Sequence, residues 1–259
     1  AFVAKTKADG TKIFWTAYLN GDSATAIAVD PAGGVWVAGT GFLARLNGTD
    51  GQLERSLETP MVTALAVDAS GAVYAGGDGW VTKYVGFEKS YTATADGLVR
   101  GLAVDGEGSA YVVSGLTLSR LTADGSAVGY SLDLGFAANS VAVDGMGAAY
   151  VTGANARLSK VTPAGDGIVF SVVPGGVLEQ EGRSVVLDGL GNIYVAGWTN
   201  SSDFARARGW HGDRDGFLLK WNASGELVDT IFKRRRPRQQ RPVPRPRSAR
   251  RRGRTGCGL

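Results

Sequence analysis

Two kinds of side chain with reactive chemistry recur at fixed places in this sequence: an aspartate and a basic residue. The aspartate ends a short apolar run and begins a D-x-x-G turn. A ring of such carboxylates would suit calcium binding or proton transfer. Single aspartates in separate repeats do not cluster oxygen ligands, so we expect each to accept backbone N–H bonds within its own turn. These structural turn residues are Asp30, Asp68, Asp105, Asp144 and Asp188.

The recurring basic residue lies near the middle of a later apolar run of the same unit. It could contribute to a cationic ring. If the unit is a four-stranded antiparallel blade, its third strand runs toward the end that carries the turn between the first and second strands. We therefore expect each base to contact the aspartate of its own unit. The basic residues are Lys5, Arg45, Lys83, Arg120, Lys160 and Lys220.

His211 is the only histidine and Cys257 the only cysteine of the 259 residues. Catalysis by a Ser-His-Asp or Cys-His group would need His211, but neither a nucleophile motif nor a metal-spaced partner accompanies it. We expect a solvated loop histidine, no catalytic residue, no metal site and no cofactor.

The elements that position these side chains follow from an internal repeat. The five turn aspartates are 38, 37, 39 and 44 residues apart. Each turn is followed by a second apolar run, then by a third run with the basic residue, and then by a more polar run. Four short strands in about 40 residues is the period of a propeller blade. The absence of a sustained 3.6-residue apolar stripe argues against helical repeats.

The predicted fold class is therefore all-β: a β-propeller of five four-stranded blades plus an N-terminal two-stranded half blade. Residues 1–10 align without a gap on residues 216–225, which places the start of the chain in a third strand. We expect the half blade at 1–21 and full blades at about 24–59, 61–95, 98–135, 138–174 and 182–232. The first strands, apolar on both faces, should be covered at a crowded axis. The missing half blade should leave an unpaired edge near residues 13–19 or between the first and last blades.

Charge divides the sequence at Lys233. The body before it holds 16 basic and 24 acidic residues, a formal charge of −8, whereas 233–259 holds 12 basic residues and no acidic one. An acidic body argues against nucleic-acid binding by the propeller. The Arg/Pro-rich segment 233–259 should be a disordered tail. It could be a polycationic arm, but we favour out-of-frame translation because no aromatic residue interleaves the arginines.

No apolar run reaches the roughly 18 residues that a membrane-spanning helix needs, so we expect no membrane span. The chain opens in the middle of a structural unit, and we expect any targeting segment to precede residue 1.

The last unit resembles the bacterial β-propeller repeat family called SBBP. The resemblance rests on VVLDGLGNIYVAGWTNSSDF followed by DGFLLKWNASGELV, with Ala205 where the family has proline. The middle units also resemble NHL-type propeller repeats. The SBBP resemblance implies an exported protein, located extracellularly, at the cell surface or in the periplasm. The rigid repeats and the lack of a catalytic constellation in the sequence favour a non-enzymatic binding or structural scaffold for an unknown protein or carbohydrate ligand. The alternative is a propeller lyase or hydrolase acting on a carbohydrate or a small cyclic ligand.

One loop breaks the repeat, and ligand sites on repeat scaffolds come from such loops. Two residues separate Gly39 from Phe42 in the first full unit, whereas nineteen separate Gly197 from Phe217 in the last. We expect this insertion to be a packed structural loop that Phe204 anchors. The alternative is that the insertion and the connection into the same blade form a ligand-binding face. The candidate ligand-binding residues are Asp203, Arg206, Arg208, Trp210, His211, Asp213, Glu179 and Glu181.

Overall fold

The structure is a computed structural model that describes residues 1–206 and 214–233. Within these residues, all regular elements are β-strands apart from one short 3-10 turn, η1 (Phe204–Arg206). All neighbouring strands pair antiparallel. Short runs rich in Val, Tyr and Ala, separated by glycine-containing turns, account for this organisation.

The chain begins with a two-stranded hairpin and continues through sheets whose strands follow sequence order. The hairpin consists of β1 (Phe2–Thr6) and β2 (Ile13–Tyr18). The first four-stranded sheet consists of β3 (Ala24–Val29), β4 (Val35–Gly39), β5 (Phe42–Leu46) and β6 (Leu53–Glu58). The last two sheets consist of β14 (Ala138–Val143), β15 (Ala149–Gly153), β16 (Leu158–Val161) and β17 (Ile168–Val172), and of β18 (Gln180–Leu187), β19 (Ile193–Thr199), β20 (Asp215–Trp221) and β21 (Leu227–Lys233).

The second and third blades are joined by one continuous strand, which the repeat pattern did not predict. β10 (Glu88–Val104) is the outer strand of the second blade and continues as the inner strand of the third. Its pairing changes from β9 to β11 between Leu98 and Val99. The other strands of this seven-stranded sheet are β7 (Ala64–Val67), β8 (Val73–Gly76), β9 (Asp78–Val85), β11 (Ala110–Ser114), β12 (Thr117–Leu121) and β13 (Val128–Asp133).

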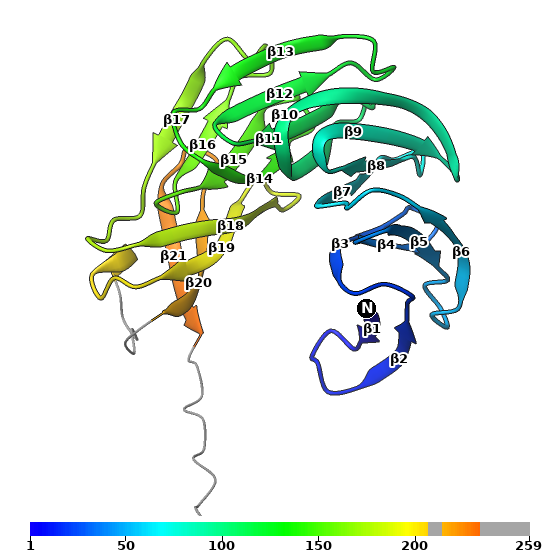
Figure 1. Cartoon of the computed structure of the whole chain (residues 1–259). Coiled ribbons are helices and arrows are strands. Elements are labelled where there is room, and N and C mark those ends of the chain that lie inside the picture. Colours follow the sequence, from blue (N-terminus) through cyan, green and yellow to red (C-terminus); the bar gives the residue numbers. More distant parts are fainter. Residues whose placement is uncertain (207–213, 234–259) are drawn as a thin grey trace, which may run out of the picture.

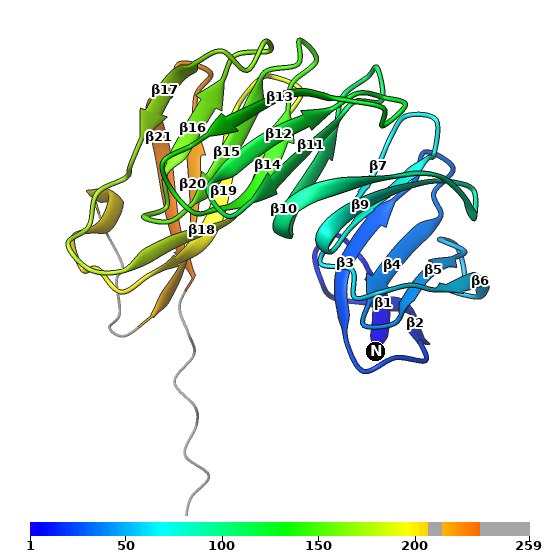
Figure 2. The same ribbon diagram turned by 45° about the horizontal axis from the view of Figure 1, so that its top comes forward.

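Consecutive sheets stand next to one another around an open arc, as Figure 1 shows. The β1–β2 hairpin lies at one end of the arc and the β18–β21 sheet at the other, and the turned view in Figure 2 keeps them apart. Counting the two halves of β10 separately, the described strands form five four-stranded blades and one two-stranded half blade. The predicted all-β propeller architecture is confirmed.

The core lies between blades and is centred on the second strands. All residues of β4, β8, β11 and β15 are buried. The expectation that the first strands are covered on both faces was wrong for the first and last four-stranded sheets, where Ile27, Val29 and Val186 are 59%, 62% and 54% exposed. In the sheets between them, β7 and β14 contain no exposed residue. Side chains on the inner side of an open arc have no opposing blade to cover them.

The C-terminal boundary differs by one residue from the expectation. Lys233 still belongs to β21, where it pairs with Gly216. The rest of the predicted basic tail, residues 234–259, lies outside the described residues.

Candidate functional site

Each turn aspartate accepts backbone hydrogen bonds inside its own turn. Asp68 Oδ1 accepts the N–H groups of Ser70 and Ala72, both at 2.9 Å. Burial raises the pKa of Asp68, but the hydrogen bonds from Ser70 and Ala72 outweigh it and hold that pKa below its ordinary value. The same pair of backbone bonds, from the second and fourth residues after the aspartate, recurs at Asp105, Asp144 and Asp188.

The second carboxylate oxygen of each turn aspartate faces an aromatic side chain six residues later. Tyr74 lies 3.2 Å from Asp68 Oδ2, and Trp36 Nε1 lies 3.1 Å from Asp30 Oδ2. Tyrosines occupy the same position in the other three blades; these are Tyr111, Tyr150 and Tyr194. The bond between these second-strand aromatics and the aspartate was not predicted from the sequence.

The predicted contact between base and aspartate forms in four blades. The N···O distances are 2.7 Å for Arg45–Asp30, 3.8 Å for Lys83–Asp68, 3.2 Å for Arg120–Asp105 and 3.9 Å for Lys160–Asp144. Each base also lies over the aromatic ring of its blade. In the last blade Lys220 lies over Tyr194, 5.6 Å from the ring centroid. Lys5 instead donates to the carbonyl of Gly48 in the following blade, at 2.7 Å.

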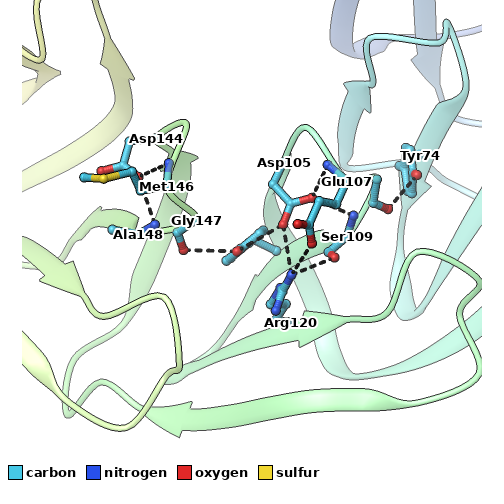
Figure 3. Close-up of polar contacts among 11 residues, drawn as sticks. Tyr74, Asp105, Glu107, Ser109, Arg120, Asp144, Met146, Gly147 and Ala148 are labelled. Carbon is cyan, nitrogen blue, oxygen red and sulfur yellow. Dashed lines mark hydrogen bonds and ion pairs between the residues drawn. The ribbon is translucent and has the colours of Figure 1, made fainter.

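Figure 3 shows that Arg120 contacts acidic and hydroxyl side chains at the turns of the third blade. Its Nη2 lies 3.2 Å from Asp105, 3.0 Å from Ser109 Oγ and 3.6 Å from Glu107. A recess of about 260 Å³ beside it is bounded by Met146 and Pro163 of the next blade, among others. Charge-assisted hydrogen bonds from the guanidinium to Asp105 and to the hydroxyl of Ser109 hold this turn together.

The loop-side residues predicted to bind a ligand belong to two segments that the structure brings together. Asn200 N–H donates to the Glu179 carbonyl at 2.8 Å, and Val177 N–H donates to Asp203 Oδ1 at 3.3 Å. The side chains of Glu179 and Asp203 are exposed. The connection into the last blade therefore runs along the start of the insertion.

Glu181 links the last two blades. One of its carboxylate oxygens accepts from Asn139 Nδ2 at 2.8 Å, and the other lies 2.9 Å from Arg183 Nη2. Asn139 also donates to the carbonyl of Gly182, at 2.9 Å. Glu181 was among the residues predicted from the sequence, but Asn139 was not. The repeat offers one signal for it, because Asn139 occupies the position that Arg183 has in the last blade.

The same inner-strand position joins other blades. Thr25 donates to the carbonyl of Val62 in the second blade, and Thr63 donates to the carbonyl of Val99 in the third. Register shifts at Ala24/Ala26 and Ala138/Ser140 release Thr25 and Asn139 from the ladder, as β-bulges do. Arg100 occupies this position in the third blade and is exposed. At this inner-strand position, Thr25, Thr63 and Asn139 bond to the next blade, whereas Arg183 pairs with Glu181 of its own strand.

The insertion is anchored by Phe204, which is fully buried. Its ring centroid lies 4.7 Å from that of Phe217 and 6.3 Å from that of Phe232. The loop is shorter than expected, because β19 continues to Thr199 and β20 begins at Asp215. Arg206 ends η1. The remaining candidates lie outside the described residues; they are Arg208, Trp210, His211 and Asp213.

Two further observations bear on the chemistry of the described residues. They contain no group of three or more His, Cys, Asp and Glu side chains arranged to hold a metal ion. None of their elements is a helix of the length and apolar character required to cross a bilayer.

The fold and the repeated turn network define a β-propeller. The SBBP family, described as a beta-propeller repeat, matches residues 181–205. This segment holds Glu181, the D-x-x-G turn of Asp188 and the Phe204 anchor. Comparison with curated proteins finds no match.

Solved structures share the fold at low sequence identity. A protein of unknown function from Bacteroides caccae is 15% identical, with a TM-score of 0.66 and 90% of each chain covered. Kuenenia stuttgartiensis hydrazine synthase is 13% identical, with a TM-score of 0.65, over 82% of this chain and 68% of that one. The WD40 repeats of RRP9 are 13% identical, with a TM-score of 0.64, over 81% and 63%. Such identities establish a shared fold alone.

Proposed function

We propose that this propeller is a non-enzymatic binding or structural scaffold that acts outside the bacterial cytoplasm, at the cell surface or in the periplasm. The observation that carries the proposal is the within-blade network of aspartate, aromatic and base. It engages the recurring charged side chains of four blades in holding their own turns. The proposed location rests on what the resemblance to SBBP repeats implies.

We place the ligand contact on the loop side of the last two blades. Glu181 and Arg183 offer opposite charges there, and Glu179 and Asp203 add exposed carboxylates. Hydrogen bonds from Val177 and Leu178 to the start of the insertion hold these segments together. Fixed charges of both signs on a rigid scaffold suit a polar ligand, either a carbohydrate or a protein surface.

The full chain is tested against a panel of neutral and acidic polysaccharides. Retention of the protein in affinity gels measures binding, and release of products from the polysaccharide measures catalysis. We expect retention without turnover, and weaker retention for Glu181→Gln combined with Arg183→Gln. The matched control is Glu88→Gln with Lys89→Gln, a neighbouring acid and base exposed on β10. Turnover would contradict the non-enzymatic assignment, and equal retention by both double variants would contradict the site. If no polysaccharide is retained, the carbohydrate ligand is excluded and the protein ligand stands as the proposal.

A further inference from the structure

The last blade exposes an apolar row, although the equivalent row of the preceding blade is buried. Ala196, Leu218 and Ile231 are directly paired across β19, β20 and β21, and we call them the front row. Leu218 is 37% exposed and Ile231 is 55% exposed. The opposite face of this sheet, with Val195 and Leu219, is fully buried against the preceding blade. The front row is therefore the uncovered side of an otherwise packed sheet.

The repeat shows what covers such a row elsewhere in the arc. In the preceding blade the equivalent residues, Leu158 and Val172, pair across β16 and β17. They pack with Val185, Val195 and Leu219 of the last blade, and Leu158 is fully buried. A front row is thus covered by the back of the next blade.

The other end of the arc exposes a back of the same kind. Phe2 pairs with Tyr18 and Ala4 pairs with Thr16 across the β1–β2 hairpin, and we call these four residues the back row. Phe2 is 66% exposed and Tyr18 is 84% exposed. By the alignment of residues 1–10 with 216–225, Phe2 corresponds to Phe217, which is 4% exposed in the core between the last two blades.

The hairpin is held in place through its other face. Val3 and Leu19 are buried against Val35, Val37 and Leu46 of the first full blade. Val3 corresponds to Leu218 in the repeat, so the same front position is covered at one end of the arc and exposed at the other. Figures 1 and 2 place the front row's sheet and the hairpin at opposite ends of the open arc, so the two surfaces do not meet within one copy.

We propose that the front row of one copy binds the back row of a second copy, so that copies associate head to tail. The contact reproduces the blade-to-blade interface that the chain already forms between its own sheets. An exposed apolar patch of this kind marks an interaction surface. Because two different surfaces are joined, a chain of copies always keeps one free front row and one free back row. The number of copies in the assembly therefore rises with protein concentration.

The experiment measures the mass of the full chain by sedimentation velocity over a concentration series. We expect the wild-type mass to rise with concentration, and the single variants Ile231→Asp and Phe2→Asp to remain monomeric, with association weakened roughly tenfold or more. Met146→Asp is the matched control, because Met146 is 79% exposed in a turn away from both rows and should associate like the wild type. Unchanged melting temperatures show that the variants are folded.

Mixing the two variants distinguishes head-to-tail contact from other modes. Ile231→Asp keeps an intact back row and Phe2→Asp keeps an intact front row, so an equimolar mixture should form one heterodimer and grow no further. A monomeric wild type at all concentrations would overturn the proposal. Dimers of Phe2→Asp alone would overturn it as well, because they would show that two front rows bind each other.

Discussion

Tyr111 of β11 donates to the carbonyl of Gly147, 3.0 Å away in the next blade. Tyr74 makes the same bond to Gly108 one blade earlier, at 2.9 Å. Each tyrosine also lies within hydrogen-bonding distance of the turn aspartate of its own blade. The turn network within a blade is therefore continuous with the contact between blades, and a single hydroxyl couples local turn geometry to the stacking of sheets.

Replacing Tyr111 by Phe should destabilise the protein by about 1–2 kcal/mol, because it removes the donor and leaves the Gly147 carbonyl without this partner. Burial raises the pKa of Tyr111 to about 12, so the hydroxyl keeps its proton and donates at neutral pH. Urea unfolding measures the effect. Tyr84→Phe is the control, since Tyr84 is buried and its hydroxyl makes no hydrogen bond among the described residues. Equal losses in the two variants would contradict the role of the inter-blade bond.

Arg45→Met should cost more stability than Lys160→Met. Arg45 lies 2.7 Å from the buried carboxylate of Asp30, and losing this charge-assisted bond should cost about 2 kcal/mol. Lys160 lies 3.9 Å from the more exposed Asp144, so its loss should cost less than about 1 kcal/mol. Thermal unfolding of both variants gives the comparison. The reverse order would show that burial of the aspartate does not determine the strength of the pair.

Acid should remove a stabilising contribution from Asp188. The side-chain hydrogen bond from Asn192 is the largest cause that lowers the pKa of Asp188 from 3.8 to about 2. Because the folded pKa is below the unfolded one, the stabilisation is present above pH 3.8 and is lost as the pH falls toward 2. Asp188→Asn should therefore show a shallower fall in unfolding free energy between pH 4 and pH 2 than the wild type. Parallel curves in urea titrations at each pH would contradict the linkage.

Phe204→Ala should destabilise the last blade by about 3–5 kcal/mol, because it empties a fully buried aromatic site between Phe217 and Phe232. Calorimetry or urea unfolding measures this loss. Leu190→Ala serves as the control, since Leu190 is 89% exposed in the β18–β19 turn and should change stability by less than about 0.5 kcal/mol. A small effect of Phe204→Ala would show that the insertion is not anchored through this ring.

The sequence alone determined the order of the strands within each blade and the chemistry of the turns, but not the continuous strand β10 that joins two blades. A D-x-x-G turn restricts its own backbone through hydrogen bonds over four residues, so local sequence suffices to specify it. The bonds from Ser70 and Ala72 to Asp68 follow from that pattern. The pairing of Arg120 with Asp105 was also predictable, since strand direction in an antiparallel blade places both at the same end.

Only the tertiary structure decided how the sheets meet. The bonds of Tyr111 to Gly147 and of Asn139 to Gly182 join residues of different blades, and their partners depend on the angle between sheets rather than on any local pattern. The exposure of Ile27 on the inner side of the arc has the same origin. An apolar strand predicts burial, but whether an opposing surface is present to bury it is a property of the assembled arc.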